Sequence, residues 1–200
     1  MNFLFTSDPI IFNLPDAEII YYPHFFDNKE ADEIFAQLKT DTPWQQDDIK
    51  VFGKVHPQPR LTALFGNEEK SYSYSNIKMQ PLPWNPLLQK IKSSIESASG
   101  TNFTTVLLNL YRNGKDSNGW HADNEKELGI NPIIASVSFG AERNFQLKHN
   151  SIPGLKQNIL LEHGSLLLMK GTTQHFWKHQ IPKTSKLIGE RINLTFRVIE

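Results

Sequence analysis

The sequence predicts a mainly β domain with flanking helices, an α+β architecture in which helices cover one side of a double sheet or barrel. Two helical patterns precede residue 101, and short alternating segments separated by Gly, Asn and Pro follow it. A chain of 200 residues suits one domain with a substantial core. We therefore expect a single domain over residues 1–200, with a helical part over 1–100 and a β core over 101–200.

Both helices are marked by their termini. Asp27 can cap a helix, with Glu30 three residues later, and Asn85 followed by Pro86 starts a second helix that stops at Gly100. The apolar stripes are Ala31, Ile34, Phe35 and Leu38 in the first helix, and Leu88, Ile91, Ile95 and Ala98 in the second.

The β segments read FTTVLLNLY, PIIASVSFG, NFQLKH, QNILLEHGSLLLMKG and RINLTFRVI. In the last of them Arg191, Asn193, Thr195 and Arg197 share one face, while the residues between them are apolar. The face with the two arginines is either exposed to solvent or lines a polar cavity.

Composition narrows the class of protein. The chain has no Cys, which excludes disulfide scaffolds, thiolate zinc sites and a Cys nucleophile. The N-terminus lacks a basic region and is interrupted by Asp8 and Pro9, so we expect no secretory signal. No apolar run approaches the roughly 18 residues of a membrane span. We expect a monomer without a membrane partner, cytoplasmic in a bacterium or nuclear in a eukaryote.

Charge is unevenly distributed along the chain. Residues 1–48 hold ten acids and two bases, a balance of −8, while residues 49–200 hold eleven acids and nineteen bases, a balance of +8. Lysine clusters in the longer part are usually solvated surface, but they could equally follow a phosphate backbone.

His121 and Asp123, two residues apart on an extended segment, can point to one side and supply two metal ligands. Two imidazoles and one carboxylate on one face of a metal are diagnostic of non-haem Fe(II) oxygenases. The candidates for the second imidazole are His149, His163, His175 and His179. Spacing alone does not choose among them, although the first two lie in predicted turns and are less favoured.

The remaining metal positions need a co-substrate, and the arginine face of the last strand suggests a dicarboxylate. Arg191 and Arg197 are roughly 20 Å apart along an extended strand, so one is the primary anchor and the other serves the second carboxylate or the site wall. Asn109 and Tyr111 share a face of an earlier strand and offer hydrogen bonds to the same ligand.

Four runs then stand in order: NLYRNGKDSNGWHADNEKELG, PIIASVSFG, LEHGSLLLMKGTTQHFWKHQIPK and ERINLTFR. Together they resemble the AlkB family of Fe(II)- and 2-oxoglutarate-dependent nucleic-acid dealkylases. Upstream, VFGKVHPQPRLTALFG and YSYSNIKMQPLPW are similar to the substrate-gripping segments of members that repair DNA, so the resemblance covers about residues 44–200. It implies a double-stranded β-helix (jelly-roll) catalytic core over 101–200 and a nucleic-acid-gripping part within 1–100.

The resemblance also implies residue roles. The iron ligands are His121, Asp123 and His179, the last because the family's final His stands just before the segment matched here by QIPK. The 2-oxoglutarate contacts are Asn109, Tyr111, Arg191, Asn193 and Arg197, and Arg197 is counted with the catalytic residues. The substrate contacts are Phe52, Lys54, Arg60, Tyr74 and Glu125.

Among the substrate contacts, Glu125 would read the damaged base, and His121 and Tyr74 would stack on it. Asn124 departs from the second acid of some DNA-preferring members. Phe52 stands before Gly53 with Lys50 and Lys54 on either side, as expected of a hairpin tip that fills the gap left by a flipped base while its neighbours hold phosphate. Arg60, beyond the turn, would contact phosphate.

The implied cofactors are Fe(II), 2-oxoglutarate and O2, and the implied reaction is hydroxylation of an N-linked alkyl group followed by aldehyde release. We expect substrates of the 1-methyladenine and 3-methylcytosine type in DNA, with duplex favoured. The alternatives are an RNA or single-stranded nucleic-acid dealkylase, or a non-catalytic nucleic-acid-binding module on the same fold. The complete ligand set and the arginine pair argue against the module.

Overall fold

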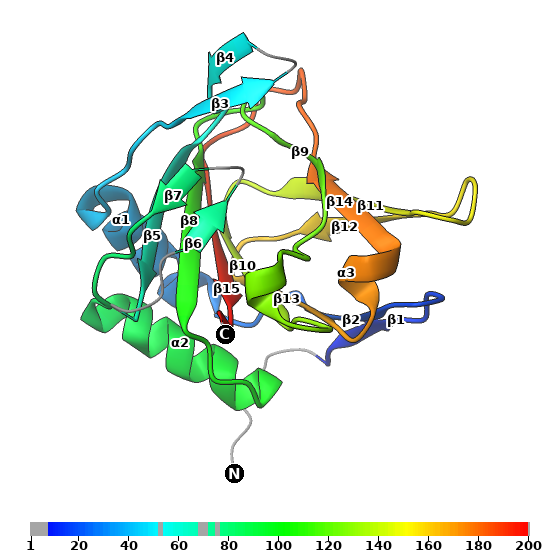
Figure 1. The fold of residues 1–200 in the computed structure, drawn as a ribbon. Helices are drawn as coiled ribbons and strands as arrows, with labels where there is room; N and C mark the ends of the chain where they lie inside the picture. The colour runs from blue at the N-terminus through cyan, green and yellow to red at the C-terminus, as the bar shows by residue number, and fades with distance from the viewer. Residues whose placement is uncertain (1–7, 52–53, 68–71, 75–76, 200) are drawn as a thin grey trace.

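Two antiparallel sheets face each other, and helices cover the outer face of the larger one (Figure 1). The computed structural model describes residues 8–51, 54–67, 72–74 and 77–199. In spatial order the seven-stranded sheet contains β1 (Ile10–Phe12), β2 (Glu18–Tyr22), β13 (Ser165–Lys170), β10 (Ile134–Gly140), β15 (Arg191–Arg197), β8 (Thr105–Tyr111) and β5 (Leu61–Gly66). The four-stranded sheet contains β12 (Lys156–Leu161), β11 (Arg143–His149), β14 (Trp177–Ile181) and β9 (Asn118–His121). The predicted mainly β double sheet is confirmed.

The two predicted helices form where their caps placed them. The carboxylate of Asp27 accepts a hydrogen bond from the Glu30 amide at 2.9 Å and starts α1 (Asn28–Asp41). The side chain of Asn85 accepts from the Leu88 amide at 2.8 Å and starts α2 (Pro86–Ser99), which ends at Gly100 with φ +70°. Two single-turn helices complete the set, η1 (Lys126–Leu128) and α3 (Thr173–Phe176). Among the described residues no helix has the length and apolar character needed to cross a bilayer.

The core has two layers, one on each face of the large sheet. One layer lies between this sheet and the helices, where Ile34 of α1 and Ile91 of α2 belong to the same buried cluster as Leu194. The other lies between the two sheets and includes Leu107, Phe145 and Trp177. Strand β15 serves both layers: Ile192, Leu194 and Phe196 face the helices, so the alternate residues face the space between the sheets. The arginine face therefore lines an interior cavity and is not exposed to solvent.

The segment QNILLEHGSLLLMKG, expected as one β segment, is two strands in different sheets. β12 ends at Leu161 in the small sheet, and β13 begins at Ser165 in the large sheet. The chain turns at Gly164, which has φ +74°, and a Cβ there would lie 2.6 Å from the Phe26 carbonyl oxygen. Only glycine meets both requirements, so this residue allows the crossing between the sheets.

Residues before 101 supply β strands as well as the two helices. β1 and β5 are the two edge strands of the large sheet, and β2 lies between β1 and β13. Two hairpins stand apart from the sheets: β3 (Asp48–Val51) with β4 (Lys54–Pro57), and β6 (Tyr72–Tyr74) with β7 (Ile77–Met79). Figure 1 shows β3 and β4 at one extreme of the molecule. The division into a gripping part and a catalytic core at residue 100 stays a prediction, although the large sheet crosses that boundary.

Candidate active site

The cavity between the two sheets is lined by all eight residues expected to bind metal or 2-oxoglutarate. They come from β8, β9, β14, β15 and the segment after β9, and they are Asn109, Tyr111, His121, Asp123, His179, Arg191, Asn193 and Arg197. Strands far apart in the sequence meet here because β14 pairs with β9 in one sheet while β15 pairs with β8 in the other.

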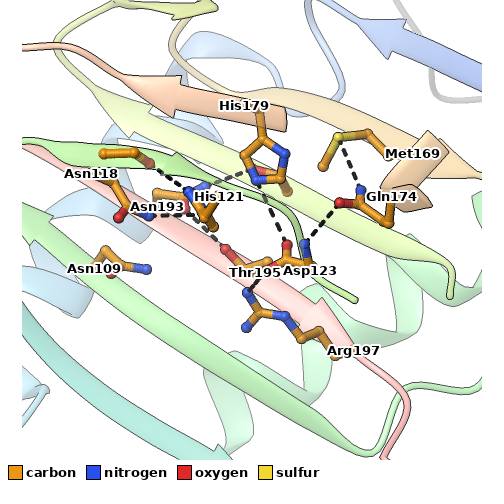
Figure 2. Close-up of polar contacts among 12 residues, drawn as sticks. Asn109, Asn118, His121, Asp123, Met169, Gln174, His179, Asn193, Thr195 and Arg197 are labelled. Carbon is orange, nitrogen blue, oxygen red and sulfur yellow. Dashed lines mark hydrogen bonds and ion pairs between the residues drawn. The ribbon is translucent and has the colours of Figure 1, made fainter. Parts of the chain in front are cut away.

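His121, Asp123 and His179 form a compact group, with one ligand atom of each within 4.8 Å of the others. His121 and His179 are direct partners in the register of β9 and β14, which brings their ring centroids to 4.2 Å. Oδ2 of Asp123 lies 3.9 Å from Nε2 of His179. Figure 2 shows the three side chains turned toward one another.

The protonation states of this group suit a divalent metal. Nδ1 of His121 lies 2.7 Å from the Gly119 carbonyl oxygen, which can only accept, so Nδ1 carries the proton and Nε2 has the lone pair. Burial lowers the pKa of His121 and, with the nearby His121 ring, lowers the pKa of His179 to about 3. Burial alone would raise the pKa of Asp123, but Arg197 and the two imidazoles lower it to about 2. Two neutral imidazoles and a carboxylate are a donor set that fits Fe(II).

Asp123 is held by two side chains. Nη2 of Arg197 donates to its Oδ1 at 2.7 Å, and its backbone N–H donates to Oε1 of Gln174 at 2.9 Å (Figure 2). Gln174 lies on α3, is 1% exposed and contacts the sulfur of Met169 through its amide nitrogen. Sequence reasoning missed Gln174, since no spacing pattern distinguishes a glutamine beside His175 from any other polar residue.

Arg191 is a buried cation that the described residues do not neutralise. It is 1% exposed, and burial lowers its pKa to about 10, which leaves it charged at neutral pH. Nη2 donates to Ser138 Oγ at 2.8 Å, whereas Nε and Nη1 have no hydrogen-bond partner in the described part of the chain. Its guanidinium lies over the Tyr111 ring, 5.2 Å from the centroid. An unpaired buried cation is costly, so this group fits the carboxylate of a small anionic ligand.

The other expected 2-oxoglutarate contacts are buried at the cavity wall. Oδ1 of Asn109 accepts from Nε of Arg60 at 2.7 Å. The amide nitrogen of Asn193 donates to Ser136 Oγ at 2.8 Å and to the Val137 carbonyl at 3.0 Å. These bonds fix both amide orientations, so the two residues line the cavity in defined positions.

The position of Arg60 corrects one expectation. A phosphate contact needs an exposed side chain, but Arg60 is 3% exposed, and besides Asn109 its Nη1 donates to the Ser117 carbonyl at 3.1 Å. Its guanidinium therefore supports the cavity wall from inside, out of reach of an external phosphate backbone. The error came from treating a basic residue near a hairpin as a surface residue.

The structure describes some of the other expected substrate contacts and not the rest. Lys54 is exposed on β4, where it pairs with Val51 across the hairpin. Phe52 lies outside the described residues, and so does the side chain of Tyr74, whose backbone belongs to β6. Glu125 is half-buried just before η1, two residues after Asp123.

The other three candidate histidines have their polar neighbours outside the group of His121, Asp123 and His179. His149 approaches Asp16 at 3.3 Å, His163 approaches Asp32 at 3.3 Å, and the exposed His175 lies 3.0 Å from Asn131 Oδ1. The structure thus supports the choice of His179, which spacing had left open.

Comparison with known proteins gives consistent matches. A model of the 2OG-Fe(II) oxygenase superfamily matches residues 18–197. The alpha-ketoglutarate-dependent dioxygenase alkB homolog 3 of Bos taurus is 46% identical over 92% of this chain, and the chain spans 66% of that protein's length. The DNA oxidative demethylase ALKBH2 of Homo sapiens is 38% identical over 89% of this chain and is covered over 72% of its own length.

Solved structures agree on the fold. OsALKBH1 superposes with a TM-score of 0.61 at 16% identity, covering 94% of this chain and 100% of that one. An oxidoreductase of the 2OG-Fe(II) oxygenase family from Burkholderia pseudomallei superposes with a TM-score of 0.59 at 14% identity, covering 90% and 84%. At such identities the likeness supports the jelly-roll core alone.

Proposed function

Because this chain belongs to the AlkB family of 2OG-Fe(II) oxygenases, we propose that it is an oxidative dealkylase of N-alkylated bases in nucleic acid. Fe(II), 2-oxoglutarate and O2 are the metal, the co-substrate and the oxidant of this family. One observation carries the proposal: a His-Asp-His group within 4.8 Å shares its cavity with a buried, uncompensated arginine. A module that only binds nucleic acid needs neither feature.

His121, Asp123 and His179 are the residues that would hold the iron. When bound, Fe(II) with 2-oxoglutarate and O2 supplies an oxidation in which succinate and CO2 leave and one oxygen atom enters a C–H bond of the N-alkyl group. The hydroxylated alkyl group then leaves the base as an aldehyde. Arg197 keeps Asp123 ionised, and Gln174 fixes its backbone, so the carboxylate is ready to bind without losing a proton.

Arg191 would anchor the distal carboxylate of 2-oxoglutarate. Its Nε and Nη1 have no hydrogen-bond partner among the described residues, so both can donate charge-assisted hydrogen bonds to the carboxylate of a ligand. Arg197 already binds Asp123, which favours Arg191 as the primary anchor. Asn109, Tyr111 and Asn193 would form the remaining walls of the co-substrate site.

For the substrate we propose alkylated DNA, with duplex favoured and bases of the 1-methyladenine and 3-methylcytosine type. The human relative at 38% identity is a DNA oxidative demethylase, which supports DNA. The β3–β4 hairpin supports duplex, because Lys54 is exposed on it and Phe52 comes directly after Val51 in the sequence. Glu125 and Tyr74 would contact the base, and Phe52 would fill its place in the stack.

The experiment that tests this proposal is detection of aldehyde released from a duplex carrying one 1-methyladenine. Aldehyde should form only when Fe(II), 2-oxoglutarate and O2 are all present, with an equal amount of succinate. Parallel reactions with the same lesion in single-stranded DNA and in RNA rank the three substrates. Tight binding of all three with no aldehyde under any condition would favour the binding module.

A further inference from the structure

The outer face of the small sheet carries a row of three lysines. Lys148 on β11 pairs directly with Lys156 on β12 and with Lys178 on β14. Side chains of directly opposed residues stand on the same face, with Cβ atoms about 4.5–5.5 Å apart. The buried neighbours Leu147 and His179 face inward, so the lysine row faces solvent, on the side of the molecule away from α1 and α2 (Figure 1).

The described part of the chain places no acid against this row. The strands β9, β11, β12 and β14 contain no Asp or Glu. Among the described residues none of the three lysines forms an ion pair, whereas Lys39, Lys90 and Lys92 of the helices each do. Like charges directly opposite each other destabilise a sheet. A surface that accepts this cost in a chain with zero formal net charge is suited to a polyanion.

Trp120 extends the row to the edge of the sheet. It lies on the edge strand β9, is 37% exposed, and its ring centroid is 4.4 Å from Nζ of Lys148. The next residue, His121, lines the cavity. Trp120, at the end of the lysine row, and the cavity-lining His121 are therefore consecutive residues of one edge strand.

We propose that the surface formed by Lys148, Lys156, Lys178 and Trp120 binds an unpaired strand of nucleic acid that continues from the target base in the cavity. The lysines would contact successive phosphates, and the exposed part of the Trp120 ring would stack on a base. A path around a single edge strand requires a sharp bend. A flexible single strand can make it, whereas a duplex with a persistence length of about 50 nm cannot.

This inference rests on the proposed function and deepens it, since it assigns a nucleic-acid contact surface outside the cavity. The β3–β4 hairpin and the lysine row belong to different sheets. Separate variants can therefore address the two surfaces.

The test is fluorescence anisotropy with labelled single strands that carry one methylated base, about 20 nucleotides long in one set and about five in the other. The variant replaces Lys148, Lys156 and Lys178 by Gln. A control with Lys29→Gln, Lys39→Gln and Lys90→Gln removes the same charge from α1 and α2. The first variant should bind the long strand at least tenfold more weakly and reduce the slope of log K against log salt by about 2, since each phosphate contact contributes about 0.7. Dealkylation of the short strand should not change.

A second pair of variants examines the aromatic ring. Trp120→Ala should weaken binding of the long strand several-fold, and Trp120→Phe should retain most of it, since a smaller ring still stacks. Binding of the short strand is the internal reference for the fold in both variants.

Three results would overturn the inference. The first is an unchanged affinity of the lysine variant for the long strand, and the second is an equal loss of affinity in the control variant. The third is a lysine variant that binds anionic lipid vesicles more weakly than the wild-type protein does but binds the long strand equally well. The last result would identify a membrane surface. Failure of the proposed function looks different. In that case the wild-type protein would bind the long strand and lose affinity in the lysine variant, yet would release no aldehyde from any strand.

Discussion

Arg197 donates a 2.7 Å hydrogen bond from Nη2 to Oδ1 of Asp123, although the two residues are 74 positions apart. Strand β15 thereby fixes a carboxylate that lies two residues after β9, the edge strand of the opposite sheet. Because this arginine is committed to Asp123, the anchor that we propose for a diacid is the other arginine of the strand, Arg191. This division of roles leads to predictions that separate metal binding from co-substrate binding.

Replacing Arg191 by Met should raise the KM for 2-oxoglutarate roughly 10- to 100-fold, since hydrogen bonds to charged groups contribute about 1.5–3 kcal/mol. The Kd for Fe(II), measured anaerobically by calorimetry, should stay the same. Arg112→Met is the matched control, because Arg112 pairs with Asp116 outside the cavity. An unchanged KM would remove Arg191 from the co-substrate site.

The same variant makes a prediction about stability. Without ligand, Arg191 is a buried cation whose Nε and Nη1 lack partners among the described residues. Its replacement by Met should leave the free energy of unfolding of the ligand-free protein unchanged or raise it. A urea titration checks this, and a loss of several kcal/mol would show that Arg191 has a structural role.

Replacing Gln174 by Met should weaken metal binding without moving the ligands themselves. The Asp123 N–H would lose its buried acceptor, at a cost of about 1–3 kcal/mol. We expect a higher Kd for Fe(II) and a lower kcat, with little change in the KM for 2-oxoglutarate. Gln157→Met on β12 is the control. If both variants bind Fe(II) equally well, Gln174 does not position Asp123.

Acid should destabilise the metal-free protein through His179 and Asp123. In the folded state the pKa of His179 is lowered to about 3, below the ordinary value of 6.5, so between these values the unfolded chain binds a proton that the folded chain does not. Stability is then lost as pH falls, by up to about 1.4 kcal/mol per pH unit. The lowered pKa of Asp123, about 2 against 3.8, acts in the same direction at lower pH.

Urea titrations of the metal-free protein between pH 7 and pH 4 measure this loss. His179→Gln should flatten the dependence, and His175→Gln should not, because His175 is exposed. The prediction fails if the two variants show the same pH dependence as the wild-type protein.

Replacing Lys54 should alter nucleic-acid binding, whereas replacing Arg60 should not. Lys54→Met should reduce the slope of log K against log salt for a duplex by about 0.9, as loss of one phosphate contact does. Arg60→Met should leave that slope unchanged and raise the KM for 2-oxoglutarate, since Arg60 holds Asn109 at 2.7 Å. A reduced slope in the Arg60 variant would restore the phosphate contact that burial argues against.

Features encoded by neighbouring residues could be predicted from the sequence. The caps Asp27 and Asn85 act on amides three residues away, so both helices were placed correctly. The two faces of β15 follow from the alternation of polar and apolar residues along the strand. That alternation allowed the polar face to be either exposed or interior, and in the structure it is interior.

Features that depend on pairing between distant strands do not follow from the local residue pattern, and His179 was singled out only through the family resemblance. The choice of His179 depends on its register with His121 across two strands, and neither strand's sequence encodes that register. The same holds for β2, whose pairing with β13 makes the acidic N-terminal segment part of the large sheet. The buried position of Arg60 arises in the same way, because its partner Asn109 lies 49 residues away on β8.

The most direct test of the account compares the His179→Ala and His175→Ala variants in one reaction. A methylated duplex is incubated with Fe(II), 2-oxoglutarate and O2, and succinate and aldehyde are both measured. The account predicts that the wild-type protein and the His175 variant form the two products in equal amounts, whereas the His179 variant forms neither. Aldehyde release by the His179 variant at the wild-type rate would contradict it.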